Sequence, residues 1–188
     1  MDKKKLALFL GMLCGDGCLT INTKSKGGYK TYAICFSNSN RDLMINFQDL
    51  FLKVFEVKGN HYTEFRESRK VTYSFRSYSR EVFDRIVSLG FPIGLKKYKL
   101  RIPQIILNLS REEKILFLKG FIITDGSIRA QGNVLFHVAT KKFLEDISNL
   151  IYELFNLRKP IKKYVQKGKY LSYQLLLNKK EAQEILNY

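Results

Sequence analysis

The residues best suited to chemistry are two aspartates that end near-identical apolar segments. Asp16 closes the run FLGMLCGDG at residues 9–17, and Asp125 closes the run LKGFIITDG at residues 118–126. Each segment carries small residues four positions apart, which lie on one helix face and let two backbones approach closely. Packing the two helices along these faces would bring both carboxylates to one end. The small residues are Gly11 with Gly15 and Gly120 with Thr124.

Each aspartate is followed by a glycine, Gly17 or Gly126, which we interpret as a helix stop in the left-handed conformation. The carboxylates then share a region that is already negative, because unpaired carbonyls gather at helix C-termini. Two carboxylates this close are unfavourable unless a cation lies between them, and hard oxygen ligands favour Mg²⁺, with Mn²⁺ as a substitute. Backbone carbonyls near Gly15 and Thr124 are expected to help hold the metal.

The duplicated segments resemble the LAGLIDADG homing endonucleases, in the single-chain form that carries two copies of the motif. The match is a glycine five residues before each aspartate and another directly after it, while Cys14 and Ile123 replace an often acidic position. The resemblance implies an α+β fold of two pseudo-symmetric αββαββα units, with antiparallel saddle-shaped sheets joined at paired motif helices. It also implies metal-dependent cleavage of both DNA strands across the minor groove of a long asymmetric target.

The composition is strongly basic. The 188 residues include 33 Lys+Arg against 17 Asp+Glu, a formal net charge of +16. This excess favours double-stranded DNA as the partner, rather than a basic surface that serves only solubility. With both motif copies in one chain, the protein is expected to act as a monomer. Three cysteines without metal-ligand spacing make a structural zinc site unexpected. The sequence predicts no signal peptide and no membrane partner, and hence an intracellular protein of a prokaryotic cytoplasm or an organelle.

The duplication organises the whole chain. We predict an N-terminal repeat at residues 1–90, a connector at 91–109 and a C-terminal repeat at 110–188, forming one pseudo-dimeric unit. Each repeat is expected to run helix, hairpin, helix, hairpin, helix. The connector is too apolar for a loose linker and is expected to pack across both halves. The predicted helix N-caps are Asn40, Ser79, Ser110 and Asn178.

Alternation along the strands divides each sheet into two faces. The face toward the helices is expected to be apolar. Its predicted members are Ile34, Phe36, Val71, Tyr73, Phe75, Val134, Phe136, Val138, Leu171, Tyr173 and Leu175.

The opposite face is polar and basic in both halves. A polar sheet face often faces only water, but a polar and basic face repeated in both halves suits β-ribbons that lie in the DNA major groove. The loops and turns are expected to contact phosphates. The residues predicted to contact DNA are Lys24, Lys26, Tyr29, Lys30, Thr31, Ser37, Tyr62, Arg66, Arg69, Lys70, Thr72, Ser74, Arg76, Asn133, His137, Lys162, Tyr164, Gln166, Lys167, Lys169, Tyr170, Ser172 and Gln174.

The resemblance places polar or basic residues near the scissile phosphates, at the end of the second strand of each half. Asn38 and Thr140 are predicted to hold these catalytic positions, where Gln or Lys would be commoner. Lys141, Lys142 and Arg129 are alternative sources of positive charge, and each is equally well explained as ordinary surface charge.

Three functions remain open from the sequence. The first is a site-specific DNA endonuclease of intron or intein origin. The others are an RNA maturase that helps its own intron to fold, and a DNA-binding protein that has lost cleavage. The intact aspartate pair favours the enzyme, because a protein that only binds has no need to bury two carboxylates together. The basic run at residues 96–99 is expected either to grip phosphates or to hold the two halves together.

Overall fold

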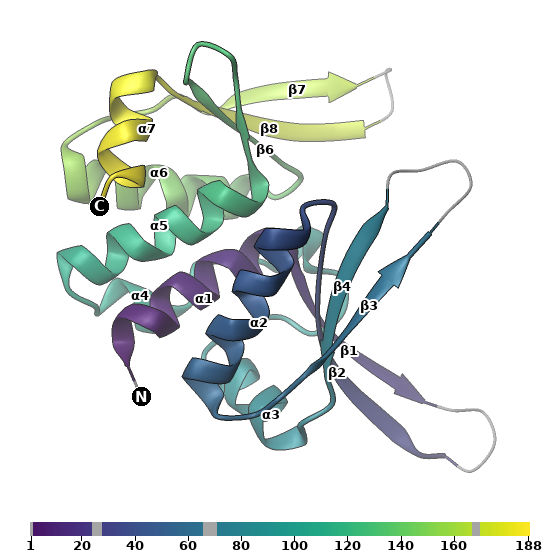
Figure 1. The fold of residues 1–188 in the computed structure, drawn as a ribbon. Helices are drawn as coiled ribbons and strands as arrows, with labels where there is room; N and C mark the ends of the chain where they lie inside the picture. Colours follow the sequence, from purple (N-terminus) through teal and green to yellow (C-terminus); the bar gives the residue numbers. More distant parts are fainter. Residues whose placement is uncertain (1, 24–27, 66–70, 167–169) are drawn as a thin grey trace.

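The computed structural model describes residues 2–23, 28–65, 71–166 and 170–188. Two copies of one arrangement lie side by side, joined by a connector (Figure 1). The first copy consists of α1 (Lys3–Asp16), β1 (Gly17–Thr23), β2 (Lys30–Asn38), α2 (Arg41–Phe55), β3 (Asn60–Glu64), β4 (Thr72–Ser77) and α3 (Arg80–Ser88). The connector holds the 3₁₀ turn η1 (Lys96–Tyr98) and the short helix α4 (Gln104–Leu107). The second copy consists of α5 (Arg111–Asp125), β5 (Gly126–Ile128), β6 (Val134–Val138), α6 (Lys141–Phe155), β7 (Lys162–Gln166), β8 (Tyr170–Leu177) and α7 (Lys179–Leu186).

The two sheets have the same topology. Their strand orders are β1-β2-β4-β3 and β5-β6-β8-β7, and every pairing within them is antiparallel. The helices gather on one side of the molecule and the hairpins extend on the other (Figure 1). The predicted fold class, two αββαββα units joined at paired motif helices, is confirmed. None of the helices in the described ranges is long and apolar enough to cross a membrane.

Local sequence sets where the helices begin. The Asn40 side chain accepts from two backbone N–H groups of α2, and the Ser79 hydroxyl accepts from the first turn of α3. Ser110 and Asn178 each form a capping box. The capping side chain accepts the backbone N–H of the glutamate three residues later, and that glutamate's side chain accepts the backbone N–H of the capping residue. All four predicted N-caps are therefore confirmed.

Helices α1 and α5 cross the centre of the molecule in direct backbone contact (Figure 1). A Cβ atom added to Gly11 would lie 2.1 Å from the carbonyl oxygen of Phe117, and one added to Gly120 would lie 2.3 Å from that of Leu8. These neighbours are backbone atoms and cannot move without separating the helices. The small residues thus set the helix spacing that brings both aspartates to one end.

The prediction of left-handed helix stops at Gly17 and Gly126 is wrong. Their φ angles are −89° and −81°, so both residues are extended and pass directly into strands β1 and β5. Glycine is needed there for space. A Cβ atom at Gly17 would lie 2.3 Å from Leu13 Cδ1, and one at Gly126 would lie 2.5 Å from the carbonyl oxygen of Ile122.

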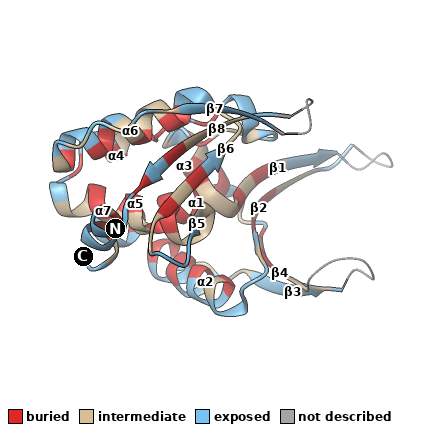
Figure 2. Ribbon diagram, turned by 90° about the horizontal axis from the view of Figure 1, so that it is seen from above, coloured by how far each residue is buried: buried red, intermediate tan, exposed pale blue. Residues whose placement is uncertain are grey.

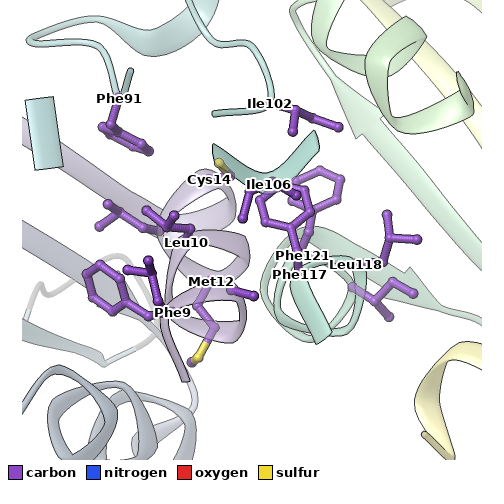
Figure 3. Close-up of a cluster of buried hydrophobic side chains, with 14 of the residues drawn as sticks. Phe9, Leu10, Met12, Cys14, Phe91, Ile102, Ile106, Phe117, Leu118 and Phe121 are labelled. Carbon is purple, nitrogen blue, oxygen red and sulfur yellow. The ribbon is translucent and has the colours of Figure 1, made fainter. Parts of the chain in front are cut away.

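The buried core surrounds the helix pair, as the burial colouring in Figure 2 shows. The connector takes part in it: Phe91, Ile102 and Ile106 are buried against the motif helices, facing Leu10 and Phe121 (Figure 3). The connector therefore packs across both halves, as its apolar composition predicted.

The predicted apolar sheet face is only partly buried. Phe36, Phe75, Phe136 and Leu175 are fully buried beneath the helices. Leu171, predicted for the same face, is 42% exposed because it lies near the tip of the β7–β8 hairpin, beyond the helices. The hairpin ends therefore extend past the core.

Candidate active site at the helix C-termini

Asp16 and Asp125 are the last residues of α1 and α5. Burial raises the pKa of Asp16, while a hydrogen bond from Asn38 and the charge of Lys96 oppose the increase. Burial raises the pKa of Asp125 to about 6, with Lys96 lowering it and the charge of Asp16 raising it further. The two carboxyl groups therefore share one electrostatic environment, which disfavours their negative charge in the absence of a cation.

The structure adds Lys96, which the sequence placed only within a basic run. Its Nζ donates to the carbonyl oxygen of Cys14 at 2.8 Å and also to that of Gly15. Its charge acts on both Asp16 and Asp125. No spacing rule could have singled out this lysine, because its partners lie about eighty positions earlier in the chain.

A cavity of about 380 Å³ opens beside these groups. Its wall includes Gly15, Lys96 and Asp125, together with His137 and Thr140 from the second half. Cys14 also lines it, although that side chain is buried, and burial raises the pKa of its thiol to about 12. The cavity therefore connects the helix ends with the polar side of the second sheet.

The two aspartates have different neighbours. Asn38 donates from Nδ2 to Oδ2 of Asp16 at 2.6 Å. Strand register identifies its counterpart in the second half: Asn38 pairs with Tyr73, and Val138 pairs with Tyr173. The position that matches Asn38 is therefore Val138, an apolar residue, and not Thr140 as the sequence predicted.

Thr140 occupies a different role. It directly precedes α6 at the N-cap position, which Asn40 holds before α2. Its hydroxyl donates to the backbone carbonyl of Lys97 in the connector. Thr140 thus ties the connector to the second half, and no described side-chain hydrogen bond joins it to Asp125.

The predicted alternative charges lie farther out. Lys141 is exposed and pairs with Glu145 at 2.8 Å, an ordinary arrangement one helical turn apart. Lys142 is exposed and lines a neighbouring hollow, which shares Thr140 with the cavity beside Asp125. Arg129 lines another hollow, beside Lys162 and Gln174. None of the three lines the cavity beside Asp125.

Residues predicted for the polar face of the first sheet lie side by side on neighbouring strands. Ser37, Ser74 and Tyr62 form one row across three strands, and the two serine hydroxyls share a hydrogen bond of 2.8 Å. Ser74 is only 2% exposed, so Ser37 and Tyr62 present this row to solvent. Arg76 pairs with Glu64 at 3.2 Å.

Further polar residues extend this face toward its edges. The Arg76 guanidinium also stacks on the Tyr62 ring, 5.2 Å from its centroid. Thr72 lies opposite Glu64, and Thr31 lies opposite Asn22. Tyr29 and Lys30 are exposed where β2 begins.

The second sheet repeats the pattern with other residues. His137, Gln174 and Lys162 form one row, and Ser172 with Tyr164 forms the next. The His137 ring bonds the Ser172 hydroxyl and meets the Tyr164 ring edge-on at 5.3 Å. The Asn133 carbonyl accepts from the backbone of Arg129 in the β5–β6 turn.

Several residues of the predicted DNA surface lie outside the described part of the chain. They are Lys24, Lys26, Arg66, Arg69, Lys70, Lys167 and Lys169, together with the side chains of Gln166 and Tyr170.

The donor set at the helix ends suits a hard divalent cation. It consists of carboxylate and carbonyl oxygens, and the carbonyls of Cys14 and Gly15 already hold the ammonium of Lys96. Within the described ranges, no group of three or more His, Cys, Asp or Glu side chains could hold a metal. Asp16 and Asp125 would therefore need the backbone carbonyls, water or a bound phosphate to complete a metal shell.

The comparisons agree with this architecture. A sequence model of the family described as LAGLIDADG-like domain matches residues 3–89 and 112–188. A structure of mesophilic variants of the homing endonuclease I-DmoI aligns with a TM-score of 0.75 at 19% identity, covering 99% of this chain and 97% of that one. The homing endonuclease I-WcaI, bound to its DNA recognition sequence, aligns at 0.63 and 16% identity, covering 100% and 82%.

A third similar structure is the N-terminal LAGLIDADG domain of DUF199/WhiA, with a TM-score of 0.62 at 14% identity, covering 100% of this chain and 81% of that one. At such identities the structural likeness shows the fold alone. The sequence model, in contrast, matches both repeats and most of the chain. On that ground, and with a motif aspartate at the end of each central helix, the chain belongs to the LAGLIDADG-like domain family.

Proposed function

We propose that this chain is a monomeric, site-specific endonuclease that cuts both strands of DNA in a divalent-metal-dependent reaction. The observation that carries the proposal is the pair of half-buried carboxylates, Asp16 and Asp125, at adjacent helix C-termini. A protein that only bound DNA would have no use for this unfavourable pairing. Two sheets with polar faces flank it, and the net charge of +16 suits a polyanion.

Each residue has a part in the proposed reaction. Asp16 and Asp125, with the carbonyls of Gly15 and Thr124, would hold Mg²⁺ or Mn²⁺. When bound, such ions supply a Lewis acid for the scissile phosphate and lower the pKa of an attacking water. Asn38 orients the Asp16 carboxylate through its 2.6 Å hydrogen bond. The sheet faces, with Ser37, Tyr62 and Arg76 in the first half, would lie against the bases and phosphates.

Similar proteins support this assignment. I-DmoI has been crystallised in complex with DNA and Ca, and a single-residue variant of it with target DNA in the presence of Mn. Both halves of the present site lie within one chain, which suits action as a monomer on an asymmetric target. An intracellular location follows from this function, because the DNA target is inside the cell.

One observation favours a second candidate, a DNA-binding protein of the same fold without cleavage. Lys96 already provides a positive charge at the carbonyls of α1, where a metal would otherwise be needed.

A single experiment separates the candidates. The protein is incubated with a random-sequence plasmid library in Mg²⁺ or in Ca²⁺, and new DNA ends are sequenced. We expect a defined double-strand cut in Mg²⁺ and binding without cutting in Ca²⁺. Selective DNA binding with no cut in Mg²⁺ or Mn²⁺ would favour the binding protein. Tight binding of structured intron RNA without DNA cleavage would favour a maturase.

A further inference from the structure

Lys96 brings a positive charge from the connector to the C-terminal end of α1. Its Nζ donates to the carbonyl oxygens of Cys14, at 2.8 Å, and of Gly15. Both carbonyls belong to the last turn of the helix, where backbone N–H partners run out. The ammonium therefore holds the backbone oxygens that a divalent ion beside Asp16 would use.

The surroundings of Lys96 keep this charge in place. A half-buried ammonium needs acceptors and opposite charges around it to remain charged. Burial lowers the pKa of Lys96, the negative charges of Asp125 and Asp16 oppose that decrease, and the two carbonyls accept its hydrogen bonds. Without a metal, the charge of Lys96 offsets part of the negative charge of the two carboxylates.

The second half has no equivalent, because the connector occurs once in the chain. The residues of α5 that match Cys14 and Gly15 are Ile123 and Thr124. Across the described ranges, no side chain donates to either of their carbonyls. The Thr124 hydroxyl instead bonds back to the carbonyls of Gly120, at 3.0 Å, and Phe121, at 3.1 Å. Among the described side chains, none therefore competes with a metal for the carbonyl oxygens beside Asp125, whereas Lys96 occupies those beside Asp16.

We propose that Lys96 is a resident cation of the Asp16 half of the site, and that a divalent ion reaches the carbonyls of Cys14 and Gly15 only by displacing it. This inference rests on the proposed metal-dependent function and deepens it. Lys96 acts by its charge on both carboxylates, but among the described residues no side chain competes for the carbonyls of Ile123 and Thr124. Metal loading is consequently unequal between the two halves of a nearly symmetric site, with the Asp125 half filled first.

Direct metal binding tests the inference without DNA. Mn²⁺ is titrated into the unaltered protein, Lys96→Met and Lys99→Met, and free Mn²⁺ is counted by electron paramagnetic resonance. Lys99→Met is the matched control, because it removes the same charge from an exposed position in the same segment. We expect Lys96→Met to bind Mn²⁺ about ten-fold more tightly or to gain a site, and Lys99→Met to match the unaltered protein. Equal or weaker binding by folded Lys96→Met would overturn the inference.

A second measurement uses the unaltered protein and does not depend on a variant folding. Buried, hydrogen-bonded ammonium groups exchange protons slowly enough for their ¹H–¹⁵N signals to be followed by nuclear magnetic resonance. We expect saturating Ca²⁺ to shift or remove the Lys96 signal. The signal of Lys114, which is buried and pairs with Glu153 at 2.6 Å, should stay unchanged.

An unmoved Lys96 signal in Ca²⁺-saturated protein, or a protein that binds no Ca²⁺, would overturn the inference. DNA cleavage is measured separately. If cleavage requires metal but neither readout involves Lys96, the proposed function stands and only the role of Lys96 is lost.

Discussion

Asn38 donates a 2.6 Å hydrogen bond from Nδ2 to Oδ2 of Asp16. The matching position in the second half is Val138, which has no donor to offer Asp125. The hydrogen bond lowers the pKa of Asp16 against the opposing effect of burial, and it fixes the orientation of the carboxylate. The two halves of the site therefore differ in the support given to each carboxylate, although their backbones follow the same topology.

Because only Asp16 has this support, substituting Asn38 is predicted to change the cleavage rate of one DNA strand more than that of the other. Asn38→Val should remove the support of Asp16 and slow cleavage of one strand roughly 10- to 150-fold, because a hydrogen bond to a charged group contributes about 1.5–3 kcal/mol. Val138→Thr serves as the matched control in the other half. The measurement is single-turnover nicking of a target labelled separately on each strand. Equal slowing of both strands by Asn38→Val would contradict the assignment.

The carboxylates themselves are predicted to be essential for cleavage and dispensable for binding. Asp16→Asn or Asp125→Asn should reduce double-strand cleavage at least about 100-fold, because each change removes a charged oxygen ligand from the metal. DNA affinity measured in Ca²⁺-free buffer by gel shift should remain within a few-fold. Unchanged cutting by either variant would refute the metal-site assignment.

The close contact between α1 and α5 can be tested with one substitution that creates a clash and a second that relieves it. A Cβ atom on Gly15 would lie 2.0 Å from Thr124 Oγ1, so Gly15→Ala should lower the free energy of unfolding by about 2 kcal/mol or more. Adding Thr124→Gly removes the clash and should recover most of the loss. Urea unfolding of the two variants and of Gln183→Ala, an exposed helical control, checks this. An additive loss in the double variant would show that the clash is not the cause.

The raised pKa of Asp125 predicts how stability depends on pH without metal. An aspartate titrates near 3.9 when unfolded, and Asp125 titrates at about 6 in the folded protein. Between these values the folded state keeps a proton that the unfolded state has lost. The stabilisation is therefore present below about pH 4 and is lost as the pH rises to about 6.

The Asp125→Asn variant isolates this effect. Between about pH 4 and pH 6, the free energy of unfolding of the unaltered protein should fall by about 2–3 kcal/mol relative to that of the variant. Urea unfolding of both proteins in EDTA, at steps from about pH 4 to 7, provides the comparison. A difference that stays constant, or that grows in favour of the unaltered protein as the pH rises, would contradict the burial of Asp125.

The basic composition predicts salt-sensitive DNA binding. If about 6–10 phosphate contacts form, affinity should fall roughly 10³-fold or more between about 50 and 200 mM salt, because counterions are released on binding. Fluorescence anisotropy with the DNA target identified by the library experiment measures the slope of log affinity against log salt concentration. Arg76→Ala should make the slope less steep if this arginine contacts a phosphate, and leave it unchanged if it only holds Glu64 and Tyr62. A nearly flat slope in the unaltered protein would exclude extensive phosphate contact.

The sequence by itself determined the repeated architecture, because the signals for it are local. Asn40, Ser79, Ser110 and Asn178 mark helix starts through bonds that reach no farther than the first turn. The paired small residues of the motif segments likewise predicted helix contact. Alternation along the strands predicted which side chains share a face. In the structure these residues lie opposite one another on paired strands, as Ser37 does with Ser74 and His137 with Gln174.

Only the tertiary structure decided how the site is completed. The bonds from Lys96 to the end of α1 and from Asn38 to Asp16 join positions far apart in the chain, which no periodicity encodes. The same holds for the identity of Val138 as the counterpart of Asn38, because that match depends on strand register. Gly17 and Gly126 proved necessary for space and not for a left-handed turn, since the crowding atoms become visible only once each helix end is packed.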